Sequence, residues 1–279
     1  MCYPPVMPAM RHVKAAALAA ACLAACGCQQ PQSQQDEATN AANAARPQTV
    51  PEIPIPVPEP PLGREQLLVA AMHAASAYAT GSDDMQAQRE LAGKKFEFRV
   101  RFGCDETASA QGDFSWSFDP ASGALKVRAA PTLSPKNAPV KAIAGDAFET
   151  VEGFWVPNPW LIAAACPRPQ APEPTPSDPV PDSQSLGIAQ FFTSSGPRTL
   201  RRSGRAYEAT KKLAQGDKPA AGFDLVLSGR LVALPNGRVI ACTPTGAGAR
   251  PSCIVSVEFG KVWIERADTK EHLADWGSG

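Results

Sequence analysis

Histidine, the side chain most often used in acid–base catalysis, is scarce in this chain of 279 residues. Beyond residue 25 only His73 and His272 are present, near opposite ends of the part expected to fold. We interpret both as helix-surface or packing residues, and their number excludes a histidine-rich metal site. The sequence contains no G-x-S-x-G, H-E-x-x-H, P-loop or G-x-G-x-x-G motif. No cofactor is therefore predicted.

Two pairs of adjacent acids, Asp83-Asp84 and Asp105-Glu106, are the remaining candidates for catalysis. Carboxylates that are adjacent in sequence do not by themselves form a general acid and a general base facing one substrate. We therefore interpret both pairs as solvated. Acid–base chemistry from Asp and Glu leaves no short motif, so the question of an enzyme stays undecided and leans to no.

A basic run is the strongest candidate for binding. The segment RTLRRSGR carries four arginines, and Lys211 and Lys212 follow with only Glu208 among them. Guanidinium groups suit phosphates and carboxylates because their N–H donors form a planar fork. We predict an anion-binding site for lipid head groups, lipopolysaccharide phosphates or cell-wall carboxylates. The alternative is a solvated loop whose charges offset acids elsewhere. The site comprises Arg198, Arg201, Arg202 and Arg205.

Four cysteines, Cys104, Cys166, Cys242 and Cys253, lie in the part expected to fold. An exported protein meets oxidising conditions, under which disulfides are the default, and four cysteines allow three pairings. One bridge in each half is the simplest arrangement, and it pairs Cys104 with Cys166 and Cys242 with Cys253. A zinc site built from all four thiolates is the alternative, but the chain has no C-x-x-C. No metal is predicted.

Alternating apolar and polar residues predict short strands in the first half. KFEFRVRF at 95–102 places its aromatic residues and Val100 on one face and its charges on the other. FSWSFDPASGALKVRA is typical of a hairpin whose turn spans 119–123. TVEGFWV at 150–156 is another expected strand. Trp155 and Trp160 flank the segment VPNP, either as an aromatic rim on a groove or as buried packing at the strand end.

Helices are expected at both ends of the folded part. The apolar stripe in 64–79 and the N-cap signal at Ser82 predict two helices ahead of the strands. The sequence at 268–271 resembles a capping box that opens a short last helix. Residues 204–214 suit a helix or a strand equally. Further strands are predicted at 223–234, 238–243, 252–259 and 261–265.

The predicted fold class is α+β and mainly antiparallel β. It has two short N-terminal helices, disulfide-stapled β-hairpins and a short C-terminal helix. Proline-rich segments divide the chain. Residues 26–63 are predicted to be a disordered tether that ends in a stiff spacer of roughly 35–40 Å. Residues 167–184 are predicted to link an α+β lobe at 64–166 to a β-rich lobe at 185–279, as two small domains or as two lobes of one.

The N-terminus is organised like an export signal. Residues 10–14 form a basic head, and the uncharged apolar run at 15–25 is shorter than the roughly 20 residues of a membrane-spanning helix. Met10 is the expected start, with Met1 as the alternative. Removal of residues 1–25 leaves 25 basic and 27 acidic residues, so the chain has no bulk attraction to nucleic acid.

The segment Leu23-Ala24-Ala25-Cys26 resembles the lipobox of bacterial lipoproteins. The resemblance covers the leader alone, and it implies that residues 1–25 are a signal peptide and that Cys26 carries the lipid anchor. Two or three acyl chains, such as palmitate, give stable anchoring. Gly27 follows the cysteine, which implies sorting to the outer membrane. The alternative is a soluble export signal, and Cys28 has no assigned role.

These observations predict an outer-membrane-anchored lipoprotein that faces the periplasm and acts as a non-enzymatic binding or scaffolding module of the cell envelope. Its expected partners are the membrane, through the lipid anchor, and an anionic envelope component or an envelope protein. No nucleic-acid partner is expected. The alternative is an exported hydrolase of unrecognised type that uses Asp and Glu for acid–base chemistry.

Overall fold

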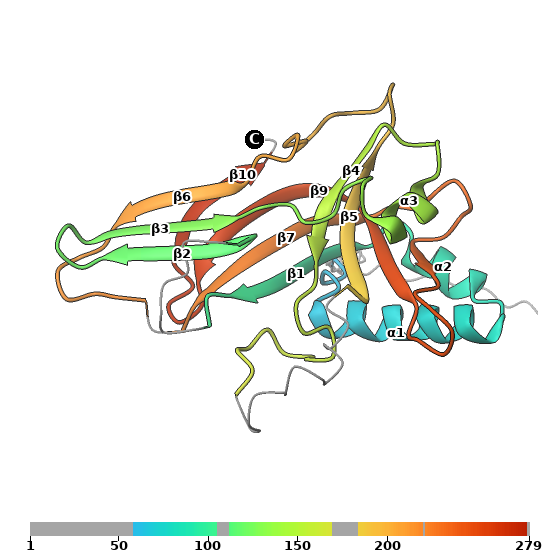
Figure 1. Ribbon diagram of the computed structural model, residues 1–279, viewed down its shortest axis with the longest axis horizontal. Helices are drawn as coiled ribbons and strands as arrows, with labels where there is room; N and C mark the ends of the chain where they lie inside the picture. The colour runs from blue at the N-terminus through green and yellow to red at the C-terminus, as the bar shows by residue number, and fades with distance from the viewer. Residues whose placement is uncertain (1–57, 105–111, 169–183, 220, 278–279) are drawn as a thin grey trace, which may run out of the picture. The chain divides into compact units, whose positions relative to one another are not determined.

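The computed structural model describes residues 58–104, 112–168, 184–219 and 221–277, which form two β-sheets and three helices (Figure 1). The leader, Cys26, Cys28 and the tether up to Val57 lie outside the described residues. So do the acid pair at 105–106 and residues 169–183 of the proline-rich link. The folded residues belong to one compact unit.

The larger sheet has seven strands and is organised around β9. Its order is β1-β7-β9-β5-β4, and β8 and β10 also pair with β9. The strands are β1 (Lys95–Phe102), β4 (Thr150–Trp155), β5 (Leu186–Phe192), β7 (Phe223–Leu231), β8 (Ile240–Thr243), β9 (Ser252–Arg266) and β10 (His272–Gly277). Strands from both sides of the link at 167–184 are therefore hydrogen-bonded neighbours in one sheet.

The smaller sheet has the order β2-β3-β6 and also joins the two sides of the link. Its strands are β2 (Phe114–Asp119), β3 (Ala124–Ala129) and β6 (Tyr207–Lys212). The predicted hairpin is confirmed, because Phe118 pairs with Leu125 and Trp116 with Val127. The ambiguous segment at 204–214 supplies β6, which pairs with β3 along its whole length.

The helices are α1 (Arg64–Thr80), α2 (Met85–Leu91) and α3 (Ala138–Ala144). α1 contributes Leu67, Leu68 and several alanines to the main core, which is shared by both sheets. α3 packs against a second, smaller cluster. Successive side chains of a strand face opposite sides, so the two clusters lie on opposite faces of the larger sheet: Val255 belongs to the first and Ile254 to the second.

The predicted fold class is wrong in two respects. The described part is mostly β, and its larger sheet is mixed rather than antiparallel, because β5 and β9 run parallel from the Leu186–Cys253 pair onward. Alternation of residue types sets the faces of a strand but carries no information on the direction of its neighbour. A parallel pair of this kind forms only through a long crossover, which here contains β6, β7 and β8.

The expected C-terminal helix is strand β10, and the residues of the apparent capping box form the turn before it. Asp268 accepts hydrogen bonds from the guanidinium of Arg266 and from the Thr269 amide. Lys270 takes a positive φ of 59°. The side chain of Asp268 thus stabilises a turn between two paired strands rather than the start of a helix.

Both disulfide predictions are confirmed. Cys104 is bonded to Cys166 and Cys242 to Cys253, with Cα–Cα distances of 5.5 and 4.0 Å. Leu62, which lies within the predicted tether range, pairs with β1. Its N–H donates to the Lys95 carbonyl, and its carbonyl accepts from the Glu97 amide.

Candidate functional site

The two histidines lie on separate elements. His73 is exposed on α1 and lines a groove between α1 and α2. His272 is on β10, where its ring stacks on Trp263 with centroids 5.6 Å apart. Its Nε2 lies 3.8 Å from a carboxylate oxygen of Glu265. No hydrogen bond joins the two histidines, so they do not form one acid–base site.

The acid pair at the start of α2 has a structural environment. Asp84 accepts hydrogen bonds from Gln88, at 2.7 Å, and from Arg238. Burial alone would raise the pKa of Asp84, but these two hydrogen bonds outweigh it and hold the pKa below the usual value. Asp83 accepts a hydrogen bond from the Met85 amide. Asp84 therefore connects α2 to the segment before β8.

The basic run lies in the segment between β5 and β6, and two of its arginines share one acid. Arg198 donates to Glu149 at 3.0 Å, and both terminal nitrogens of Arg201 donate to the same carboxylate at 3.2 Å. Arg201 also lies 5.9 Å from the centroid of the Phe192 ring. For these two residues the structure agrees with the alternative interpretation, in which the charges offset acids elsewhere.

The other two arginines hold the backbone of the same segment. Arg202 donates to the Ala206 carbonyl at 2.7 Å and lies over the Tyr207 ring, 4.8 Å from its centroid. Arg205 donates to the Arg202 carbonyl at 3.1 Å. Glu152 accepts from the backbone amides of Arg202 and Ser203, at 2.7 and 2.8 Å. Anion binding by this segment stays a prediction, since most of its donors already have protein acceptors.

Two buried carboxylates, Asp224 and Glu265, are register neighbours on β7 and β9. Arg101 donates twice to Asp224, at 2.7 and 3.1 Å, and Lys270 lies 2.9 Å from it. Arg99 lies 3.2 Å from Glu265, which also accepts from other side chains of the sheet. A buried charge is costly unless it is paired. The cations offset that cost, so we interpret this network as structural.

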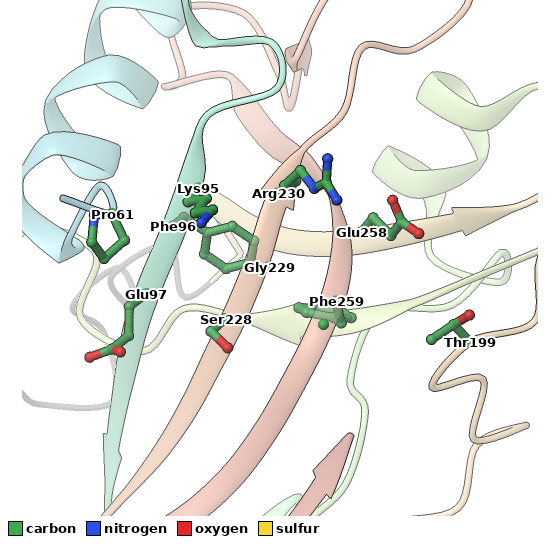
Figure 2. Close-up of a pocket in the computed structure, with 11 residues that line it drawn as sticks. Pro61, Lys95, Phe96, Glu97, Thr199, Ser228, Gly229, Arg230, Glu258 and Phe259 are labelled. Carbon is green, nitrogen blue, oxygen red and sulfur yellow. The ribbon is translucent and has the colours of Figure 1, made fainter. Parts of the chain in front are cut away.

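A shallow hollow of about 490 Å³ opens where β1, β7 and β9 lie side by side (Figure 2). Its centre is formed by residues with small side chains, Ser228, Gly229 and Gly260. Thr199, from the basic segment, lines the same hollow. The hollow is therefore lined both by the basic segment and by strands of the larger sheet.

A β-bulge shapes this hollow. The register of β7 with β9 shifts between Ser228, opposite Lys261, and Gly229, opposite Phe259. Gly260 is the extra residue, and the bulge is the reason that β9 changes which side chains face outward. A Cβ on Gly229 would lie 2.0 Å from the Glu258 carbonyl oxygen. Glycine is therefore required where the two backbones approach each other.

Three charged side chains cross the hollow in a row. Lys95 is the register neighbour of Arg230, and Arg230 that of Glu258; Figure 2 shows them on β1, β7 and β9. All three are exposed, and within the described residues none of them makes an ion pair or a side-chain hydrogen bond. Glu97, in the next row, is paired with Arg99 at 2.6 Å.

This arrangement suits binding better than catalysis. Two adjacent cations attract a carboxylate or a phosphate, and Glu258 beside them adds an acceptor for a hydroxyl or an amine. The hydroxyl of Ser228 donates to the Lys261 carbonyl at 3.1 Å, and within the described residues it makes no hydrogen bond to a side-chain base. No local sequence pattern predicts this row, because its members lie on three strands that are distant along the chain.

Comparisons with models of protein families, with curated proteins and with solved structures find no match for this chain. Within the ranges that the structure describes, no group of three or more His, Cys, Asp or Glu side chains is arranged to hold a metal ion. No helix in the same ranges has both the length and the apolar character needed to span a bilayer.

Proposed function

We propose that the protein is a lipoprotein, anchored through Cys26 in the outer membrane and facing the periplasm, and that its folded part is a non-enzymatic binding module of the cell envelope. The observation that carries the binding role is the row of Lys95, Arg230 and Glu258. These charges are exposed and unpaired over an open hollow, whereas the buried carboxylates Asp224 and Glu265 are compensated by cations.

Two further observations support export and anchoring. All four cysteines of the folded part are in disulfides, which persist in oxidising compartments such as the periplasm and are rare in the cytosol. The leader resembles that of lipoproteins, with Cys26 at the lipidation position. The mature N-terminus then carries two or three acyl chains, enough for stable membrane attachment.

The binding role is tested by co-sedimentation with purified cell-wall sacculi and, separately, with lipopolysaccharide. The double variant Lys95→Ala/Arg230→Ala should lose at least tenfold in affinity for the anionic component, and wild-type binding should weaken as salt is raised. Lys126→Ala is the matched control, because Lys126 is also an exposed strand lysine without an ion pair. Equal binding by the double variant and the control would refute a role for the hollow.

Anchoring is tested by the mass of the protein isolated from native envelopes. An N-terminal Cys26 bearing a diacylglyceryl group, with or without an acylated amine, is the expected result. Cys26→Ser should abolish labelling by radioactive palmitate. An unmodified mature chain that begins at another residue would exclude the anchor, and the result of the sacculus experiment would still decide the binding role.

An exported hydrolase is the second candidate, because two carboxylates, Glu97 and Glu258, line the same hollow. Incubation with sacculi distinguishes the two. A binding module releases no soluble wall fragments over time. A hydrolase releases them, and Glu258→Gln then stops the release.

A further inference from the structure

The segment that follows β4 carries two exposed large apolar side chains. Trp160 is 60% exposed and Ile162 52%, the two highest values among the large apolar side chains that the structure describes. Trp155, by contrast, is buried in the second core cluster. No charged residue occurs between Glu152 and Arg168. We call residues 157–166 the Trp160 loop.

The Trp160 loop is held in place by a partly buried arginine. Arg64 donates to the carbonyls of Leu161 at 2.9 Å, Asn158 at 3.1 Å and Pro157 at 3.4 Å. A fourth hydrogen bond, at 3.1 Å, joins Arg64 to the Arg99 carbonyl, so the loop is attached to β1. Three of the four hydrogen bonds that the Arg64 guanidinium donates are therefore made to this exposed loop.

Two other features restrict the same loop. Its last residue, Cys166, is bonded to Cys104, which lies just beyond β1. Asn158 has a positive φ of 48°, a left-handed conformation that asparagine tolerates, and this residue therefore defines a turn in the loop. The loop is therefore ordered before it meets any partner, and binding through it costs little conformational entropy.

The position of the Trp160 loop indicates which partner covers it. Arg64 is the first residue of α1, directly after the point where residues 1–57 join the fold, and Leu62 fixes that point to β1. Figure 1 shows the chain after β4 running past the start of α1 and away from the sheets. The described chain therefore begins on the side of the fold that carries the Trp160 loop.

We propose that the Trp160 loop docks on a lipid bilayer, with Trp160, Leu161 and Ile162 in the interfacial layer. The proposal rests on the anchoring proposed above. An uncharged tip with an exposed tryptophan suits the membrane interface, where the ring meets acyl chains and the indole N–H remains near water. Arg168, which is exposed and follows the loop, is placed to meet lipid phosphates. The loop adds a second membrane contact to the lipid anchor.

The test uses lipidated full-length protein reconstituted in vesicles of phosphatidylethanolamine and phosphatidylglycerol with brominated acyl chains. Bromine quenches tryptophan that enters the acyl region, so wild-type fluorescence should fall relative to unbrominated vesicles. Trp160→Phe should remove this quenching. Trp276→Phe should retain it, because Trp276 packs on Tyr207 within the fold. Absence of quenching in the wild type, or its survival in Trp160→Phe, would overturn the proposal.

A second readout separates docking from anchoring. Protein that lacks the acyl chains is mixed with the same vesicles and floated on a density gradient. Trp160→Ser/Ile162→Ser should reduce the floated fraction about tenfold, and Val232→Ser, another exposed apolar side chain, should not. A photo-cross-linker at position 162 should label lipid. An adduct with a protein, or with a second copy of the chain, would assign the loop to that partner instead.

Discussion

Tyr207 shows how one buried side chain couples the basic segment to the core. Burial raises the pKa of Tyr207 to about 12, while the nearby Arg202 opposes this shift and Glu152 adds to it. The side chain is only 2% exposed, and its ring packs edge-on against Trp276 and under the guanidinium of Arg202. The folded state therefore favours the neutral form of the Tyr207 side chain.

The pH dependence of stability follows from this shift. Tyrosine ionises near pH 10 in an unfolded chain, so its contribution is complete below pH 10 and is lost as pH rises toward 12. Across that window the wild type should lose about 2–3 kcal/mol more than Tyr207→Phe, measured by denaturant unfolding at a series of pH values. Parallel stability curves for the two proteins would contradict this prediction.

Asp224 is the second residue for which a sharp effect is expected. It is fully buried and compensated by Arg101 and Lys270, so Asp224→Asn leaves Arg101 without its acid and Lys270 with Glu265 alone, at 3.5 Å. Unfolding free energy should fall by about 3–5 kcal/mol. Asp275→Asn is the control, because Asp275 is exposed and pairs with Lys261 at 3.7 Å, and it should change stability by less than about 1 kcal/mol. Similar losses in the two variants would show that burial does not decide the effect.

Among the elements, the bulge between β7 and β9 restricts most strongly which residue can occupy a position. A methyl group at Gly229 would collide with the Glu258 carbonyl, so Gly229→Ala must displace one of the two strands. We expect a loss of about 1–3 kcal/mol in thermal or denaturant unfolding. Gly246→Ala is the matched control, since the nearest atom to its added Cβ is 3.8 Å away. Equal stability of the two variants would show that the bulge relaxes.

The elements also show what the sequence predicts and what it cannot. The alternation in KFEFRVRF predicts β1, and the turn at 119–123 predicts the hairpin of β2 and β3; both signals lie within a few residues, and both are confirmed. Residues 252–259 and 261–265 were expected as separate strands, but they form one strand. Gly260 lies between the two predicted strands, and in the structure it is the bulge residue of a continuous strand. Only the pairing of β9 with β7 distinguishes these two cases.

Local sequence patterns do not predict the candidate site, because it too depends on contacts between distant parts of the chain. The basic segment was visible as a composition feature, but its acceptors Glu149 and Glu152 come from the region around β4, about 50 residues earlier. The charged row of the hollow depends on the register of three strands. In the sequence, the Trp160 loop is recognisable only as two tryptophans near prolines. Its exposure follows from Arg64, which the sequence does not connect to it.

At the scale of the whole molecule, the disulfides close loops of very different length, with sequence separations of 62 and 11 residues. Chain entropy then predicts losses of about 4 kcal/mol for Cys104→Ser/Cys166→Ser and about 3 kcal/mol for Cys242→Ser/Cys253→Ser. Unfolding in denaturant, with and without reductant, measures both. A variant in which all four of these cysteines are replaced is the control, because reductant should leave its stability unchanged. Loss of stability in that variant on reduction would point to another target.

The position of β9 along the chain has a consequence for how the protein is made. Until residues 252–266 have been synthesised, the larger sheet consists of two separate ladders, β1 with β7 and β4 with β5. A two-stranded ladder alone is marginally stable in water. A chain that has been synthesised only as far as β8 therefore lacks the assembled sheet. Under the export proposed above, such a chain is still in a form that a translocation channel can thread.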